Sequence, residues 1–290
     1  MGNLTGVRHD RSTVAKLTVK KCFLYLLLTV IAIVLMFPFF VMLMRSFMGI
    51  DDIYAARIIP TEFTLDNYRS VLIGNHYLKY TFNTLKVVAF NIIAIPMASS
   101  LCAYSFARVR WKGKEFVFAC VLSTMMIPGT VLQIPLYVLF WNLGWLGTLL
   151  PLTLPAIFGG GAMNIFLIRQ FMRSVPKEMD EAALMDGAGV FRRYLQIILP
   201  LCRPILIYVM VGAFSAAWSD FFSPLIYLTG YHEKYTLAVA IYEDSILNSV
   251  LETSNLKMAA GVFMSVLPLI LFAFSQRTLI DGVMIGAVKG

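Results

Sequence analysis

Long apolar runs alternate with short polar segments along the whole chain. A helix needs about 20 mostly apolar residues to cross the hydrocarbon core of a bilayer, and each run is close to that length. The runs are apolar on all sides, which indicates helices and not the alternating strands of a membrane barrel. The pattern therefore predicts an all-α membrane protein. Its six transmembrane helices are expected at residues 22–44, 82–106, 116–141, 147–168, 204–228 and 256–276.

All of the predicted spans contain residues that interrupt a helix. They are Pro38, Pro96, Pro128, Pro135, Pro155, Pro224, Pro268 and the glycines at 159–161. Proline removes a helix hydrogen bond, and such breaks persist where neighbouring helices or a water-lined cavity satisfy the freed backbone groups. The number of breaks favours a bundle that bends around a pathway.

The distribution of Lys and Arg predicts the orientation of the chain. Seventeen of these residues fall in the N-terminal arm, the loops after spans two and four, and the C-terminal tail, against six in the opposite loops. The positive-inside rule then places both termini in the cytoplasm. The apolar run after the basic arm is too long for a signal-peptide core, so we expect a retained first span. The net charge of +8 is thus a topology signal, and no nucleic-acid partner is expected.

A polar segment at residues 169–203 separates the fourth and fifth predicted spans. Ser174 and Pro176 give a helix-start signal, and the acidic residues that follow complement the helix dipole. Gly187 suits the left-handed residue that ends a helix. We therefore expect a short helix, a glycine turn and then a second helix.

The second helix is expected over residues 190–200, with Phe191, Leu195 and Ile198 on one apolar stripe. Two interpretations of this amphipathic segment remain open. It lies on the lipid surface, or it inserts as a knob into a groove on a cytoplasmic partner.

The same segment carries a long gapped motif: Glu-Ala-Ala at 181–183, three residues, Gly187, nine residues, and then Ile-x-Leu-Pro at 197–200. It resembles the "EAA" signature of binding-protein-dependent ABC importer permeases. In that family the loop is the coupling helix that docks on the ATPase subunit. The resemblance implies a coupling role for Glu181, Ala182, Ala183, Asp186, Gly187, Ile197, Leu199 and Pro200.

Further stretches resemble the branch that carries sugars of the maltose and multiple-sugar type. They include residues 60–72, 103–114, 125–140, 216–228 and 276–290, and the resemblance covers about residues 20 to 290. It implies a cytoplasmic N-terminal arm (1–21), a six-span domain (22–276, with a MetI-like core at about 78–276) and a cytoplasmic tail (277–290). The expected location is a bacterial or archaeal cytoplasmic membrane.

The resemblance also implies carbohydrate import by alternating access. The expected partners are two ABC ATPase subunits, a second permease subunit in a heterodimer, an extracytoplasmic sugar-binding protein and membrane lipid. No stretch reads GxxxxGK[ST], so ATP and Mg are expected on the separate ATPase subunits and no cofactor on this chain. The histidines are scattered without a ligand partner at metal-binding spacing, so we predict no metal site, no catalytic residues and no enzymatic activity.

The fifth predicted span contains the informative stretch Trp218, Ser219, Asp220 and Phe221. A carboxylate at membrane depth is costly and usually faces the bundle interior or water. Asp220 therefore lines a solute pathway, or it bonds a neighbouring helix at Asn83, Asn91 or Lys86. Ser219 stands where the sugar branch often has Asn. The two aromatic residues stack on a sugar ring or simply mark the membrane interface.

Two other classes compete with the importer. A secondary transporter or channel would need coupling-ion residues near the midplane, for which Asp220 and Lys86 are a thin set. An intramembrane enzyme would need a paired catalytic group, and the sequence suggests none. The tail at 277–290 is expected to be either a disordered end or a segment that reaches toward the ATPases.

Overall fold

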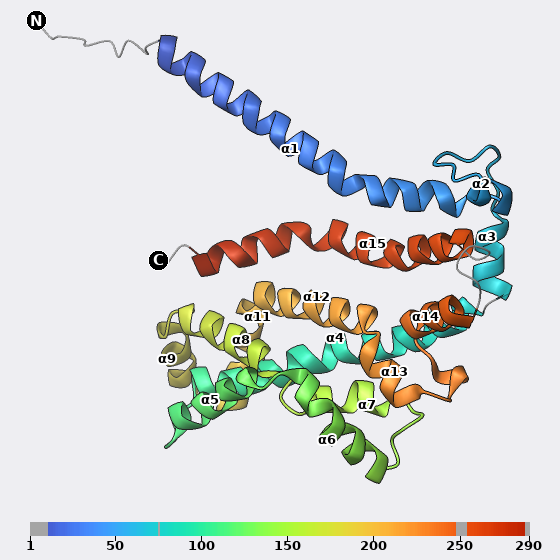
Figure 1. Cartoon of the computed structure of the whole chain (residues 1–290). Coiled ribbons are helices and arrows are strands. Elements are labelled where there is room, and N and C mark those ends of the chain that lie inside the picture. Colours follow the sequence, from blue (N-terminus) through green and yellow to red (C-terminus); the bar gives the residue numbers. More distant parts are fainter. Residues whose placement is uncertain (1–10, 75, 248–253, 288–290) are drawn as a thin grey trace, which may run out of the picture. The chain divides into compact units, whose positions relative to one another are not determined.

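The computed structural model describes residues 11–74, 76–247 and 254–287, and every regular element within these ranges is helical (Figure 1). The predicted all-α class is therefore confirmed. The chain forms two units, one of residues 1–68 with 251–262 and one of residues 69–250 with 263–290. The three longest helices are α1 (Arg11–Ser46), α4 (Tyr77–Ala107) and α15 (Ser254–Ala287).

The other elements are short, because proline, glycine or polar residues interrupt the apolar runs. The α-helices among them are α2 (Ile50–Tyr54), α3 (Asp66–Arg69), α5 (Lys114–Ser123), α6 (Gly129–Asn142), α7 (Leu150–Thr153), α8 (Ala162–Ser174), α9 (Glu178–Met185), α10 (Val190–Arg193), α11 (Leu199–Leu201), α12 (Arg203–Ser219), α13 (Phe222–Leu228) and α14 (Leu237–Leu247). The 3-10 turns are η2 (Thr124–Met126), η3 (Leu154–Ile157) and η5 (His232–Lys234). Two π turns complete the set, η1 (Ser70–Gly74) and η4 (Tyr194–Ile198).

Four helical segments are long and apolar enough to cross a membrane by themselves. They are Lys20–Ser46, Tyr77–Ala107, Leu150–Ser174 and Ser254–Gln276, and they overlap the first, second, fourth and sixth predicted spans. Two further helix pairs pass only together, Lys114–Met126 with Gly129–Asn142 and Val190–Leu201 with Arg203–Ser219. The described residues thus hold four to six candidate spans.

Two predicted spans are each divided into two helices. Within 116–141 the chain bends by 98° at Pro128, because the residue before a proline is displaced from the helical region and Ile127 is extended, with ψ 118°. Within 204–228 the break falls at Asp220, whose backbone is extended between α12 and α13. Of the predicted helix breakers, Pro128 thus ends a helix, whereas Pro224 lies within α13. Four others lie inside continuous helices, namely Pro38, Pro96, Pro135 and Pro268.

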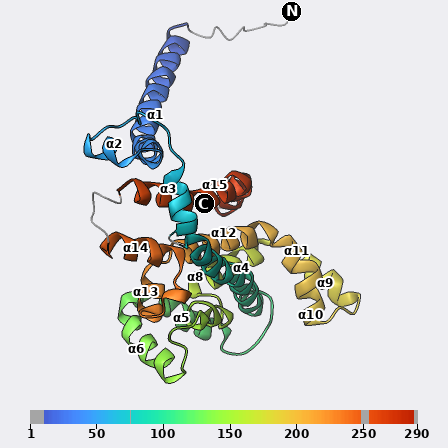
Figure 2. The same cartoon turned by 90° about the vertical axis from the view of Figure 1, so that its right-hand side faces the viewer.

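Helix α4 forms the axis of the second unit, and α8 and α12 pack along it. Small buried residues, Ser99 and Ala103, allow the helices to approach closely, as is typical of membrane bundles. Gly160 fits against the same face of α4 with a positive φ of 66°, and a Cβ there would overlap the carbonyl oxygen of Ile95. Figures 1 and 2 show α9 and α10 at one end of α4 and α14 at the other.

The first unit is held together by amide hydrogen bonds around Asn67. Its Nδ2 donates to the carbonyl oxygens of Ser46 and Met48 at 2.9 and 2.8 Å, and its Oδ1 accepts from Asn255 at 3.0 Å. Nearby, Asp52 accepts from the hydroxyl and backbone N–H of Thr61. These bonds hold the pKa of the Asp52 carboxyl below its usual value.

The predicted tail differs from the structure. Helix α15 continues without a break past Gln276 to Ala287, so residues 277–287 are helical and the expectation of a disordered end is wrong for them. Residues 288–290 and residues 1–10 of the predicted N-terminal arm lie outside the described ranges.

Candidate functional site

Residues 176–201, called the hairpin below, comprise α9, a glycine turn and the continuous helical segment α10–η4–α11. The helix start predicted from Ser174 and Pro176 is close to the observed one, since α9 begins at Glu178, but Ser174 does not belong to it. That residue is the last of α8, and its hydroxyl donates to the carbonyl oxygen of Phe171 at 2.7 Å. Val175 is extended, as expected for a residue before proline, and α9 begins at Glu178 with acids in its first turn.

The end of α9 is a complete Schellman cap. Gly187 is left-handed with φ 75°, and its N–H donates to the carbonyl of Leu184 at 3.0 Å. The N–H of Ala188 donates to the carbonyl of Ala183 at 2.9 Å, and these two alanines are both buried. The predicted glycine stop is confirmed. The small side chain of Ala183 therefore serves the packing of the hairpin itself, and it does not lie on its surface.

The outer face of the hairpin is apolar and exposed. Met185 is 87% exposed, Phe191 is 65% exposed and Leu184 is 57% exposed. Four of the predicted coupling residues are also exposed, namely Glu181, Ala182, Asp186 and Gly187. Large apolar side chains gathered on one exposed feature are typical of a surface that another protein or a membrane covers.

The structure divides the predicted apolar stripe, which was expected to face lipid or a partner: its members Phe191 and Leu195 are exposed as expected, but Ile198 is not. Tyr194 and Ile198 are buried, whereas Phe191 and Leu195 are exposed. The predicted stripe assumed 3.6 residues per turn throughout. The π turn η4 places five residues in one wider turn and so rotates the preceding part of the helix outward.

The remaining motif residues of the second arm hold it in place. Ile197 and Leu199 are partly buried and pack against the core cluster of the second unit, which includes Met172 and Cys202. Pro200 is exposed near the end of this segment. The structure thus divides the predicted coupling residues into an exposed group on α9 and an anchoring group on the second arm.

The first arm is fixed by a buried ion pair that the sequence analysis did not single out. Arg108 follows the last residue of α4, and its Nη1 lies 2.9 Å from Oδ2 of Asp180 in the first turn of α9. Its Nη2 donates to the carbonyl of Val175 at 2.6 Å and also to the carbonyl of Met172. One guanidinium therefore joins α4, the end of α8 and α9. No sequence pattern links residues so far apart.

The second arm is fixed to α4 by tyrosine hydroxyls. Tyr104 donates to the carbonyl oxygen of Val190 at 3.1 Å, and Tyr194 shares a 2.8 Å hydrogen bond with Ser100. The two tyrosine rings pack with their centroids 5.1 Å apart. Both arms of the hairpin are consequently attached to the same end of α4, through polar groups that are largely shielded from water.

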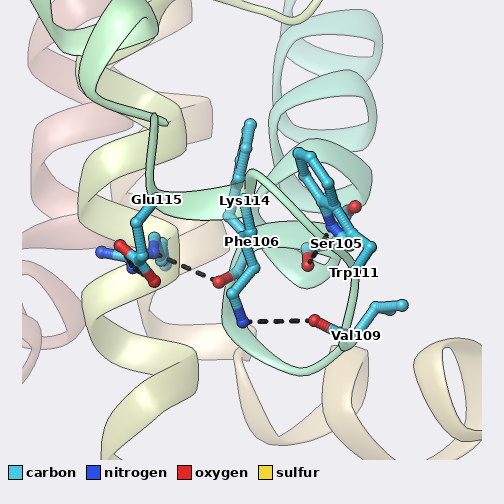
Figure 3. Close-up of polar contacts among 7 residues, drawn as sticks. Ser105, Phe106, Val109, Trp111, Lys114 and Glu115 are labelled. Atoms are coloured by element: carbon cyan, nitrogen blue, oxygen red, sulfur yellow. Dashed lines mark hydrogen bonds and ion pairs between the residues drawn. The ribbon is translucent and has the colours of Figure 1, made fainter. Parts of the chain in front are cut away.

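A second buried guanidinium lies beside the hairpin but does not contact it. Nη2 of Arg169 on α8 lies 2.9 and 2.8 Å from the two carboxylate oxygens of Glu115, and the guanidinium lies 3.9 Å from the ring centroid of Phe118. Glu115 opens α5 and its side chain is 69% exposed. Figure 3 shows this loop, in which Lys114 also donates to the carbonyl of Val109 at 3.2 Å.

The predicted pathway residues lie around the break between α12 and α13. Trp218 is buried and donates to the carbonyl of Met264 at 3.0 Å, while Ser219 is exposed. Asp220 accepts from the N–H of Ser223 at 3.1 Å and so caps α13. The ring of Phe221 packs edge-on against Tyr242 with centroids 4.6 Å apart. The hydroxyl of Ser219 donates to the carbonyl of Ser215 at 2.7 Å, so all four side chains have structural partners within the fold.

The expected structural partners of Asp220 are engaged elsewhere. Asn83 donates to the carbonyls of Glu233 and Tyr235, Asn91 donates to the carbonyl of Leu152, and Lys86 lies over the ring of Phe82. The predicted bond from Asp220 to one of these three side chains is therefore wrong, and the partner of its carboxylate is the backbone N–H of Ser223 on the next helix turn of its own chain segment.

Comparison with known proteins identifies relatives along almost the whole chain. The galactooligosaccharides transport system permease protein GanQ of Bacillus subtilis (strain 168) is 31% identical over 277 residues, which cover 94% of this chain and 96% of that one. The maltodextrin transport system permease protein MdxG of the same organism is 30% identical over 268 residues, which cover 92% and 95%.

A solved structure shares the fold. It is a chain of a bacterial ABC transporter involved in the import of the acidic polysaccharide alginate, with a TM-score of 0.79 and 21% identity over 94% of this chain and 99% of that one. The model of the family described as "Binding-protein-dependent transport system inner membrane component" matches residues 91–284, a range that includes the whole hairpin. The chain therefore belongs to this family of multi-pass inner membrane components of binding-protein-dependent transport systems.

Proposed function

We propose that this chain is a permease subunit of an ATP-driven importer that carries a sugar or oligosaccharide across the cytoplasmic membrane. Support comes from the family and from relatives named as permeases for galactooligosaccharides and maltodextrin. Membership of a binding-protein-dependent family favours the importer over a secondary transporter or channel. The proposed partners are an extracytoplasmic sugar-binding protein, a second permease subunit and two ABC ATPase subunits that hold ATP and Mg.

We propose six spans with both termini in the cytoplasm, on the strength of the Lys and Arg distribution. The third span is then the bent pair α5–η2 and α6. The fifth is α12 with α13, preceded by a 79° bend that separates it from the hairpin. Because Arg192 and Gln196 are exposed and pair with each other at 2.9 Å, the second arm suits the cytoplasmic face better than the hydrocarbon. The six-span domain covers residues 22–276.

The observation that carries the proposal is the exposed apolar face of a rigidly anchored hairpin. Leu184, Met185 and Phe191 project from α9 and the second arm, while both arms are tied to α4. An amphipathic helix that only rests on lipid needs no such anchoring. A helical knob that presents apolar side chains to a groove is a recurring mode of protein recognition. We therefore propose that α9, with Glu181, Ala182 and Asp186 beside the apolar face, docks on an ATPase subunit.

In the proposed mechanism, closure of two ATPase subunits on ATP displaces the docked α9. Because the hairpin is attached to α4 and α8, those helices move with it as a body, and the cavity between permease subunits alternates between the two sides of the membrane. Ser219 remains the pathway candidate, since its side chain is exposed at the break between α12 and α13. Trp218 and Asp220 would act by holding the helices around it.

Reconstitution tests this function. The chain would be assembled in liposomes with its partner permease, the ATPase subunits and the binding protein, and uptake of labelled maltodextrins or galactooligosaccharides would be measured. We expect uptake that requires ATP, the binding protein and the ATPase. Uptake that persists without the ATPase subunits, or that occurs with this chain alone, would contradict the proposal.

A further inference from the structure

The Arg108 guanidinium is a junction between three segments. Its two terminal nitrogens contact the carbonyls of Met172 and Val175 at the end of α8 and the carboxylate of Asp180 on α9, while its own backbone extends α4. Among the described residues, this is the one side-chain hydrogen bond or ion pair that leaves α9. A movement of α9 is therefore passed to the neighbouring helices through this ion pair and through the backbone on either side of α9.

The pair is poorly suited to a purely stabilising role. The side chains of Arg108 and Asp180 are 7% and 13% exposed, so both charges are desolvated, and their mutual attraction offsets only part of that desolvation free energy. In addition, Arg108 Nε and Asp180 Oδ1 are buried without a hydrogen-bond partner among the described residues. A buried pair with unsatisfied atoms is weak evidence for stability, whereas its fixed geometry makes it a stiff link.

We propose that Arg108 and Asp180 are positioning residues that transmit the movement of α9 to α4 and α8, so that ATP hydrolysis on the partner is converted into transport. The inference rests on the proposed docking of α9 and adds the route by which the docked helix moves the spans. Arg169 and Glu115 provide an internal comparison, since this equally short ion pair joins α8 to α5 and does not touch α9.

The experiment compares Asp180→Asn with Glu115→Gln in the complete reconstituted complex. Both substitutions keep the size of the side chain and remove one charge from a guanidinium pair. The readout is the number of sugar molecules transported per ATP hydrolysed. We expect Asp180→Asn to keep ATP hydrolysis but lower this ratio roughly five- to tenfold, the lower part of the range for coupling between sites. Glu115→Gln should leave the ratio unchanged.

Further variants distinguish a loss of coupling from misfolding of the Asp180→Asn protein. Arg108→Lys keeps the charge but replaces the planar fork with a single ammonium, and it should give a smaller loss of the ratio. In a background without the four native cysteines, Arg108→Cys with Asp180→Cys should be uncoupled, and a short thiol-reactive crosslinker should restore the ratio. The four native cysteines are free, so their removal breaks no disulfide. Because the crosslink carries neither charge, rescue would assign the effect to the mechanical connection, provided that the uncrosslinked variant unfolds at the same temperature as the wild type.

The outcomes separate the two proposals. If the wild-type complex fails to retain the ATPase or shows no ATP-dependent uptake, the proposed function fails. If the wild type is active and Asp180→Asn transports as much sugar per ATP as Glu115→Gln, the link alone is overturned. Loss of the ATPase subunit from the Asp180→Asn complex would also overturn it, because the pair would then shape the docking surface instead of transmitting its movement.

Discussion

The two ends of α4 are attached to their surroundings by different chemistry. At the Ala107 end, charged and phenolic side chains of α4 and Arg108 reach the hairpin. At the Tyr77 end, Asn83 donates to two carbonyls of an irregular segment, and Thr84 accepts from the N–H of Leu237 at 2.9 Å. The phenol of Tyr77 also donates to the carboxylate of Asp244 at 2.6 Å. Amide and hydroxyl bonds fix backbone in place at moderate cost, whereas a buried ion pair is costly and directional. Under the proposed coupling, the end with the buried ion pair transmits movement and the other end stays fixed.

Gly187→Asp should produce the largest effect, at the hairpin end. A Cβ at Gly187 meets no atom within 4 Å, so membrane insertion and folding should survive. A carboxylate on the docking surface would be buried without a partner on assembly, which costs about 3 kcal/mol or more and weakens docking by about 100-fold. We expect uptake to be abolished while the protein level in membranes is unchanged.

The control for this variant is Gly187→Ala. It carries the same strain of a side chain at φ 75°, about 1–2 kcal/mol, but no charge. Uptake should be reduced far less than by Gly187→Asp. Wild-type uptake by Gly187→Asp would contradict docking through this surface.

Among substitutions at the Tyr77 end of α4, Asn83→Ala should have the largest effect. It should lower the stability of the protein and leave the coupling of ATP hydrolysis to transport unchanged. The substitution leaves the carbonyls of Glu233 and Tyr235 without their donor, which costs about 1–3 kcal/mol. Thermal unfolding of the purified complex should occur at lower temperature, and sugar transported per ATP should not change. Asn91→Ala, which removes a single bond to Leu152, serves as the matched control and should cost less. A fall in the transport ratio of Asn83→Ala would break the comparison between the two ends.

Tyr104→Phe should have a smaller effect, since it removes one hydroxyl donor and keeps the ring. The lost bond to the carbonyl of Val190 is worth about 0.5–1.5 kcal/mol. Hydrogen exchange should become faster in residues 188–194 and stay the same around Asn83. Unchanged exchange in both regions would mean that this bond does not hold the second arm.

Lys79→Met should have almost no effect. The ammonium of Lys79 lies 3.8 Å from a carboxylate oxygen of Glu233, and both side chains are exposed, so the pair is worth about 0–1 kcal/mol. The unfolding temperature should match that of the wild type at high salt and differ only slightly at low salt. A loss as large as that of Asn83→Ala would show that surface charge, and not buried amides, secures this end.

Much of this architecture was predictable because the lengths of the apolar runs and the positions of helix-breaking residues can be read directly from the sequence. The runs that became α1, α4 and α15, the breaks at Pro128 and at 159–161, and the glycine stop at Gly187 all follow from local chemistry. The EAA signature also locates the hairpin from the sequence alone. The range of the family match, which includes the hairpin, agrees with that reading.

The features that escaped prediction depend on tertiary contacts or on a change of helical period. The Arg108–Asp180 pair joins residues separated by 72 positions, and no local pattern marks it. The π turn at Tyr194–Ile198 separates Ile198, which is buried, from Phe191 and Leu195, which are exposed, although the sequence there is compatible with an ordinary α-helix. Helix α15 continues beyond Gln276 because nothing in the sequence after it stops a helix, even though the apolar run has ended.

The buried position of Ala183 has a consequence for exchanging ATPases between related transporters. If α9 docks on an ATPase subunit as proposed, Ala183 shapes the docking helix without contacting the partner, because the Schellman cap encloses it. The exposed apolar side chains Leu184, Met185 and Phe191 would then help to distinguish one ATPase from another. Exchanging those three positions is the smallest change expected to redirect this permease to the ATPase of another transporter.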